Sequence, residues 1–200
     1  DLARSRGLGD VYKRQELVRF EKNANAAGYE NQWHHDVTWR ETPSQGAILR
    51  AIEIPPIGGD TLFVDANAAY EGLTLEMKDE IDSLNAVHDF LRAFGRQVPK
   101  EKLAEMREMY PLVKHPVVIN HHQTGKPLLY VNRIFVNGIE GYDEKEGFEL
   151  IDALCREFEV LEYSCRFKWE KNSIAFWDNQ AVQHYACLLY TSPSPRDLAR

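Results

Sequence analysis

The feature that most constrains the fold is a series of short β-branched or apolar runs bounded by turn residues. The clearest are 44–54 and 59–65, separated by Pro-Pro and Gly-Gly dipeptides, and we expect them to be neighbours in a sheet. Residues 117–120 and 128–132 flank Gln-Thr-Gly-Lys, which predicts a hairpin. Three later runs also read as strands: 163–170, 173–177 and 183–186. Because helices and strands do not alternate regularly, the pattern predicts a strand-dominated sandwich or β-roll.

Helical patterns are inserted between these runs. Asp65 can cap a helix over 66–71, and Thr74 can cap another that continues to Leu84. Residues 99–110 have helical composition. A longer helix that Asp143 can cap carries its apolar residues on one face: Phe148, Ile151, Leu154, Cys155 and Phe158. The sequence therefore predicts a mainly β domain with inserted helices.

Composition excludes several classes of protein. The 200 residues suffice for one domain, and 24 basic against 31 acidic residues give a net charge of −7. This charge leaves no basic field to hold a nucleic acid. No apolar run approaches the roughly 18 residues of a membrane span. The three cysteines, Cys155, Cys165 and Cys187, have neither disulfide-framework nor zinc spacing, which indicates a reducing, cytoplasmic compartment.

The two ends do not belong with the middle. Asp-Leu-Ala-Arg occurs at 1–4 and again at 197–200. Residues 1–15 and 187–200 resemble translated sequencing-adapter sequence, so we interpret both as non-native tails. The alternative is a natural tail at each end. The domain itself is expected to be 16–186, and the natural protein to continue beyond both junctions, so that its β-fold is truncated at both ends.

Two histidines and one carboxylate form the candidate chemical site. His34 and Asp36 lie two residues apart in a strand-like run, so their side chains are expected to share a face. His184 lies on another expected strand that a closed β-roll can bring alongside. Such a facial triad binds non-haem iron(II) and leaves coordination positions open. A His-x-Asp pair by itself is weak evidence of a metal, since strand histidines commonly serve structural roles.

Five motifs, taken in their order along the chain, resemble those of a known protein family. They are Trp-His-His-Asp-Val-Thr-Trp at 33–39, Gly-Gly-Asp-Thr-Leu-Phe at 58–63, His-Asp-Phe at 88–90, Lys-His-Pro-Val-Val at 114–118 and Phe-Trp-Asp-Asn-Gln-Ala-Val-Gln-His-Tyr-Ala at 176–186. In order and spacing they resemble the taurine dioxygenase family over essentially all of 16–186. The resemblance implies a double-stranded β-helix, jelly-roll or cupin-like and related to clavaminate synthase. It also implies iron(II) held by His34, Asp36 and His184, with 2-oxoglutarate and O₂ as co-substrates.

The same resemblance assigns further residues. Thr61 matches the threonine whose hydroxyl binds a carboxylate of 2-oxoglutarate, although a threonine after a Gly-Gly turn is also an ordinary strand residue. Phe94 and Phe135 match aromatic residues of the substrate pocket, or are simple core. Asn31 stands one position from the family's substrate-contacting asparagine, with Glu30 at the matching place. The arginines that the family carries after its distal histidine have no counterpart here in register.

The resemblance implies a dioxygenase that hydroxylates a small anionic molecule and releases succinate and CO₂. Taurine or another alkylsulfonate is the leading substrate, followed by alkyl sulfates and aryloxyalkanoates. The chain as it stands is then a fragment of that enzyme. Two alternatives stay open: a zinc-dependent hydrolase using the same triad, and a non-catalytic β-roll binding module. A symmetric homo-oligomer is compatible with the family.

The remaining histidines are interpreted as structural. His35 is expected to point away from the triad, and His88 and His115 to be hydrogen-bonded within the fold. His121 and His122 fall at the expected hairpin turn and are predicted to be solvated. Trp177, upstream of His184, either borders the metal pocket or belongs to the core.

Overall fold

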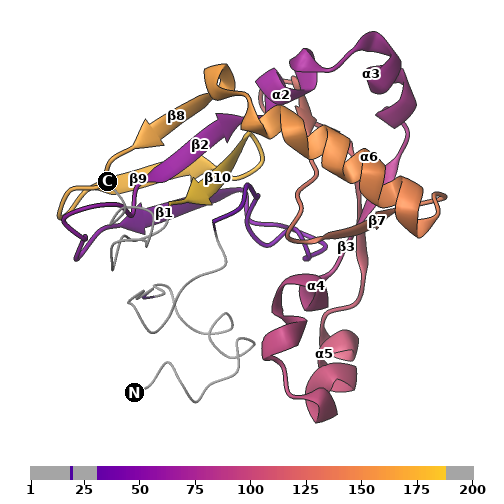
Figure 1. Cartoon of the computed structure of the whole chain (residues 1–200), viewed down its shortest axis with the longest axis horizontal. Coiled ribbons are helices and arrows are strands. Elements are labelled where there is room, and N and C mark those ends of the chain that lie inside the picture. Colours follow the sequence, from indigo (N-terminus) through magenta and orange to yellow (C-terminus); the bar gives the residue numbers. More distant parts are fainter. Residues whose placement is uncertain (1–18, 20–30, 188–200) are drawn as a thin grey trace, which may run out of the picture. The chain divides into compact units, whose positions relative to one another are not determined.

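The computed structural model describes Arg19 and residues 31–187 (Figure 1). The terminal segments interpreted as non-native tails, 1–15 and all of 187–200 except Cys187, lie outside these residues. That interpretation therefore stays a prediction.

Ten short strands and several helices follow one another in the described residues. The strands are β1 (Gly46–Arg50), β2 (Thr61–Asp65), β3 (Asn85–His88), β4 (Val113–Pro116), β5 (Val118–Asn120), β6 (Pro127–Leu129), β7 (Val136–Ile139), β8 (Ser164–Phe167), β9 (Ile174–Asp178) and β10 (Val182–Ala186). The α-helices are α2 (Ala66–Gly72), α3 (Leu75–Ile81), α4 (Phe90–Phe94), α5 (Leu103–Met109) and α6 (Glu144–Arg156). Four single 3₁₀ turns are Gly95–Gln97, Lys100–Lys102, Glu157–Glu159 and Leu161–Tyr163. The predicted mainly β chain with inserted helices is confirmed.

Two antiparallel sheets carry the N- and C-terminal strands. One has the order β10-β2-β8 and the other is the pair β1-β9. The expectation that 44–54 and 59–65 are sheet neighbours is wrong, because β1 pairs with β9 while β2 pairs with β8 and β10. Strands β9 and β10 are consecutive but belong to different sheets, joined only by the turn at 179–181. This short turn links the two sheets.

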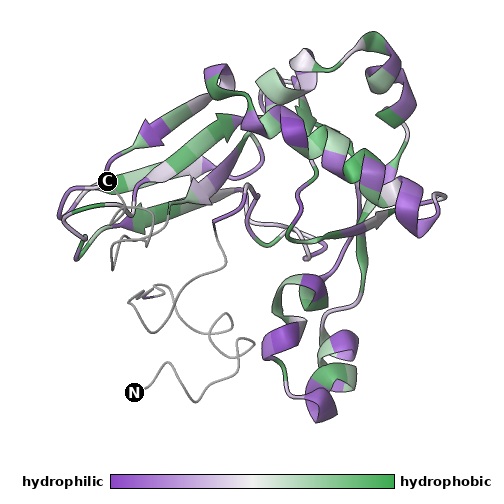
Figure 2. Ribbon diagram, in the orientation of Figure 1, coloured by the Kyte–Doolittle hydropathy of each residue, from purple (hydrophilic) through white to green (hydrophobic). Residues whose placement is uncertain are grey.

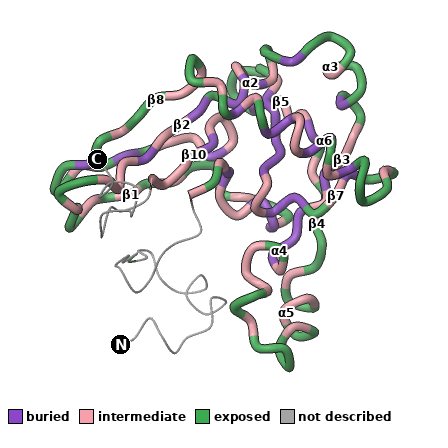
Figure 3. The backbone as a smooth tube through the Cα atoms, in the orientation of Figure 1, coloured by how far each residue is buried: buried purple, intermediate pink, exposed green. Residues whose placement is uncertain are grey.

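The middle of the chain supplies two further small sheets and most of the helices. Their orders are β4-β3-β7 and β5-β6, the second being the predicted hairpin. Helix α6 packs on β7 and α2 packs on β6. Buried residues occur on β3, β6 and β7, whereas α3 and α5 are largely exposed (Figure 3). No helix among the described residues is long and apolar enough to cross a membrane.

Helix α6 has the two-faced pattern expected from its sequence, with apolar and polar stripes visible in Figure 2. Leu150, Ile151, Leu154 and Cys155 are buried on one face, and Phe158 continues the same cluster just beyond the helix. Asp143 caps the helix as predicted: its side chain accepts a hydrogen bond from the Glu146 N–H at 2.8 Å.

Replacing Asp143 by alanine is expected to destabilise the fold by about 1 kcal/mol, because one N–H at the start of α6 loses its acceptor. Chemical unfolding monitored by circular dichroism measures the change. Asp143→Asn, which keeps an acceptor, serves as the control and is expected to lose less. Equal stability of all three chains would show that the cap contributes nothing.

Candidate metal centre

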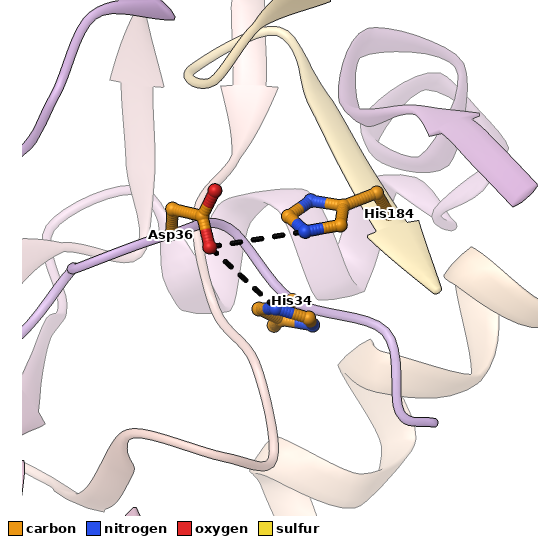
Figure 4. A group of neighbouring side chains, drawn as sticks. All are labelled: His34, Asp36 and His184. Atoms are coloured by element: carbon orange, nitrogen blue, oxygen red, sulfur yellow. Dashed lines mark ion pairs between the residues drawn. The ribbon is translucent and has the colours of Figure 1, made fainter. Parts of the chain in front are cut away.

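Three side chains from two distant parts of the sequence converge on one point (Figure 4). One ligand atom from each of His34, Asp36 and His184 can be chosen so that all lie within 4.8 Å of one another. Asp36 Oδ1 lies 3.7 Å from His34 Nε2 and 3.8 Å from His184 Nε2. An ion about 2.1 Å from two ligand atoms leaves them at most about 4.2 Å apart, so both distances fit one shared ion.

A pair of backbone hydrogen bonds brings the two histidines together. The His34 N–H donates to the His184 carbonyl at 3.1 Å, and the His184 N–H donates to the His34 carbonyl at 3.0 Å. This is an isolated antiparallel bridge on the edge of β10 opposite β2. Directly opposed residues in such a bridge project to the same face, which places the imidazole centroids 4.2 Å apart.

Asp36 reaches the site by a different route from the one predicted. The expected strand-like run through His34 and Asp36 is wrong: after the bridge at His34, the chain makes a turn over 36–39, where the Arg40 N–H donates to the Val37 carbonyl. Val37 has φ of +50°, a left-handed conformation that β-branched residues rarely adopt. His34 and Asp36 do share a side, as expected, but a turn produces this arrangement.

Hydrogen bonding prepares His34 for ligation. Its Nδ1 lies 2.8 Å from the Gln32 carbonyl, which can only accept, so Nδ1 carries the proton and Nε2 presents its lone pair toward Asp36. The His34 and His184 side chains are 5% and 12% exposed, whereas that of Asp36 is 37% exposed. The centre is therefore open to solvent on the carboxylate side and enclosed on the imidazole side. Two imidazoles and one carboxylate suit iron(II) with open positions.

Thr61 lies on the same sheet face as the metal-binding side of His184. His184 is directly opposite Phe63 in the β2–β10 pair, and Thr61 lies two residues before Phe63 on β2. Side chains two apart on a strand point to one face. The buried Thr61 hydroxyl accepts a hydrogen bond from Trp169 Nε1 at 3.0 Å. That bond uses a lone pair and leaves the hydroxyl proton available to a ligand. The sequence analysis singled out Thr61 and did not consider Trp169.

Aromatic rings surround the triad. The ring of Phe135 lies 6.5 Å from that of His34, and Phe94 packs next to Phe135 at 6.1 Å. Trp177 lies 5.1 Å from His184, so of its two expected positions it takes the one beside the site. Asn31 is half-buried, and its matching neighbour Glu30 lies outside the described residues. The substrate-binding roles of Phe94, Phe135 and Asn31 stay predictions.

Two of the remaining histidines have the structural role expected. His88 Nδ1 lies 2.8 Å from Thr38 Oγ1, and His115 Nε2 lies 2.8 Å from the Thr38 carbonyl, so both support the turn at 36–39. The expectation that His121 is solvated is wrong: it is buried, and its Nε2 lies 2.9 Å from Asp178 Oδ2. The position of His121 at a turn gave no sign that the carboxylate of Asp178, 57 residues later, would bind this ring.

Burial governs the protonation of the inner histidines. Burial and the neighbouring His34 lower the pKa of His35 to about 3. Burial, His115 and His35 hold the pKa of His88 well below its ordinary value. Thr38 and Tyr130, which also lie next to His88, carry no charge at neutral pH. Both rings are therefore neutral in the folded protein.

The depressed pKa of His88 makes stability fall in acid. Below about pH 6.5 the unfolded chain binds a proton at His88 that the folded chain does not, so the free energy of unfolding decreases as pH falls toward the folded pKa. The contribution of this residue is about 1 kcal/mol between about pH 6.5 and 5.5. We expect His88→Gln to show a correspondingly shallower decrease over that range in chemical unfolding. If the free energy of unfolding fell equally steeply with pH in both chains, this role of His88 would be contradicted.

Comparison with known proteins agrees with this geometry. The model of the family "Taurine catabolism dioxygenase TauD, TfdA family" matches residues 2–200. The chain is 32% identical over 174 residues to an alkylsulfatase of Acinetobacter baylyi, covering 84% of this chain and 55% of the relative. It is 34% identical over 163 residues to an alpha-ketoglutarate-dependent sulfate ester dioxygenase of Pseudomonas putida, covering 78% and 54%. The chain thus spans about half the length of these relatives.

Solved structures show the same fold. A taurine dioxygenase from Burkholderia xenovorans is 36% identical with a TM-score of 0.67, covering 78% of this chain and 50% of that one. AAD-2 in complex with Mn(II) and N-oxalylglycine is 27% identical with a TM-score of 0.75, covering 82% and 65%. The expected jelly-roll class is thereby confirmed. The chain belongs to the TauD, TfdA family of taurine catabolism dioxygenases.

Proposed function

We propose that the protein is an iron(II)- and 2-oxoglutarate-dependent dioxygenase that hydroxylates a small anionic sulfonate or sulfate ester. The observation that carries the proposal is the convergence of His34, Asp36 and His184 on one point. The donor set is the one that non-haem iron oxygenases use. Taken alone, this donor set does not argue against a zinc hydrolase. Thr61 adds that argument, because its side chain lies on the same face of the sheet as that of His184, where its hydroxyl would be a hydrogen-bond donor for a keto acid.

Each residue has a separate task in this proposal. His34, Asp36 and His184 would hold the iron on one side and leave the other side accessible. Iron(II) with 2-oxoglutarate and O₂ supplies the oxidising power that hydroxylates a C–H bond and yields succinate and CO₂. Trp169 donates a hydrogen bond to the oxygen of the Thr61 hydroxyl. In this proposal the hydroxyl, so oriented, would donate to a 2-oxoglutarate carboxylate. Phe135 and Phe94 would exclude water and hold the apolar part of the substrate.

The relatives support the co-substrate and the substrate class. N-oxalylglycine, held with Mn(II) in AAD-2, has the oxo-acid and second carboxylate of 2-oxoglutarate. The named relatives include a sulfate ester dioxygenase and an alkylsulfatase. Among small anionic molecules we favour alkylsulfonates such as taurine, with alkyl sulfates and aryloxyalkanoates next. We also propose a cytoplasmic location, in keeping with three free thiols.

An anaerobic titration with iron(II) and 2-oxoglutarate tests the proposal. The keto acid bound to iron gives a visible charge-transfer absorption, and we expect it in the wild type and not in His34→Ala. The measurement uses the 200-residue chain and, in parallel, a continued chain in which the C-terminal segment of the Burkholderia xenovorans enzyme replaces residues 187–200. Circular dichroism verifies that each is folded.

The result separates the alternatives. Absorption that requires His34 establishes the reaction class and justifies a succinate-release screen of sulfonates and sulfate esters. No absorption from a folded continued chain would reject the dioxygenase. Zinc binding with hydrolytic activity would then favour the hydrolase, and absence of any metal binding would favour a binding module.

A further inference from the structure

Asn179 is a fully buried polar side chain that contacts the backbone of a metal-ligand residue. Its Oδ1 accepts a hydrogen bond from the Asp36 N–H at 2.7 Å. Its Nδ2 donates to the Asp36 carbonyl at 3.0 Å and to the Ser44 carbonyl at 2.9 Å. One amide side chain thus pairs with both backbone groups of Asp36, as a neighbouring strand would.

The backbone that Asn179 holds is strained. The carbonyl of Asp36 belongs to the peptide that joins it to Val37, whose φ is +50°. This conformation costs free energy for a β-branched residue and persists only where surrounding contacts enforce it. Released from Asn179, the chain would relax toward negative φ at Val37. That movement would swing the Asp36 carboxylate away from His34 and His184.

Asn179 is itself held at the junction of the two sheets. It follows β9 directly, and its N–H donates to the Gln45 carbonyl next to β1. The preceding Asp178 accepts hydrogen bonds from the N–H groups of Gln180 and Ala181. The buried His121 binds the other carboxylate oxygen of Asp178. The turn is therefore fixed before it leads into β10, which carries His184.

We infer that Asn179 is a positioning residue for the metal centre: it holds the strained turn at Asp36 while the turn it belongs to delivers His184. One short segment would thereby set the relative placement of two ligands that are far apart in sequence. The inference rests on the proposed iron site for its consequence, whereas the effect on the backbone of Asp36 does not depend on any metal.

The test compares Asn179→Ala with Asn67→Ala. Asn67 is half-buried and also bonds the backbone, since its Nδ2 donates to the Pro127 carbonyl at 2.7 Å, and this contact lies outside the turn over 36–39. Anaerobic Co²⁺ titration followed by absorption measures metal affinity, and hydrogen exchange measured by NMR in metal-free protein reports the Asp36 amide. For Asn179→Ala we expect affinity to fall about 10–100-fold and the Asp36 amide to exchange at least about tenfold faster. Asn67→Ala is expected to lose stability with metal affinity within about threefold of wild type.

Two further variants keep the test sharp if Asn179→Ala does not fold. Asn179→Asp keeps an acceptor for the Asp36 N–H but loses the donor to its carbonyl, so an intermediate loss of affinity is expected. Val37→Gly removes the strain, because glycine adopts positive φ freely. Added to Asn179→Asp, it is expected to restore affinity at least about threefold.

The outcomes are distinct. Wild-type affinity and slow Asp36 exchange in Asn179→Ala would overturn the inference, as would an equal loss of affinity in Asn67→Ala. If the folded wild type binds no metal, the proposed function fails. The exchange rate of Asp36 then decides whether Asn179 holds the turn.

Discussion

Changing Asp36 to asparagine is expected to abolish the stabilisation that iron(II) gives to the folded protein. At a metal concentration 100 times the dissociation constant, binding stabilises the fold by about 2.7 kcal/mol, which raises the melting temperature by about 5–10 °C in a protein of this size. A single ligand of a protein metal site accounts for about 3 kcal/mol of binding, or roughly 100-fold in affinity. The shift in Asp36→Asn should therefore be below about 2 °C.

Anaerobic thermal unfolding with and without iron(II) measures both shifts. Without metal, we expect the variant to melt close to the wild type, because the amide has the size of the carboxylate and its partly exposed position tolerates the loss of charge. Asp152→Asn, on α6 among Arg133 and Arg156, is the control and should keep the full shift. An undiminished shift in Asp36→Asn would remove Asp36 from the ligand set.

Changing Thr61 to valine is expected to weaken 2-oxoglutarate binding by about 10–100-fold while leaving metal affinity unchanged. The variant keeps the shape of threonine but removes the hydroxyl that would donate to a carboxylate, and a hydrogen bond to a charged group contributes about 1.5–3 kcal/mol. The same change leaves the buried Trp169 N–H without its acceptor, at a cost of about 1–3 kcal/mol in stability.

Trp169→Phe separates the two effects of Thr61→Val. Alone, it should weaken 2-oxoglutarate binding less than Thr61→Val, because the hydroxyl remains. Combined with Thr61→Val, it should recover most of the lost stability and none of the lost affinity, since the unpaired N–H is gone. Chemical unfolding and the 2-oxoglutarate dependence of the visible absorption measure the two quantities. Full recovery of affinity in the double variant would mean that Thr61 acts only through packing.

Local patterns predicted much of the fold because they depend on neighbours in sequence. Asp65, Thr74 and Asp143 cap helices where capping chemistry placed them. The hairpin around Gly125 forms, with that glycine at φ of +70°. The helix after Thr74 ends at Ile81 and not at Leu84, a typical uncertainty at helix ends.

The pairing of strands that are distant in sequence could not be predicted as well. Nothing local indicates that β1 pairs with β9 and not with the adjacent β2. Strands β3 and β7 were not expected, because each is four residues long and lacks a distinct pattern. The triad was found from its residue types and motif order, yet the turn at Asp36 was not. Val37 favours an extended backbone, and contacts from distant residues such as Asn179 oppose that preference.

The bridge between His34 and His184 joins positions about 150 residues apart, which makes the centre one of the last features that a folding chain could complete. An ion bound there would join the two ends of this long loop in the folded chain alone, and would stabilise the fold through its affinity for that state. Resistance to unfolding would then depend on iron supply. In a cell short of iron, such a protein would lose its activity and would also unfold and be degraded more readily.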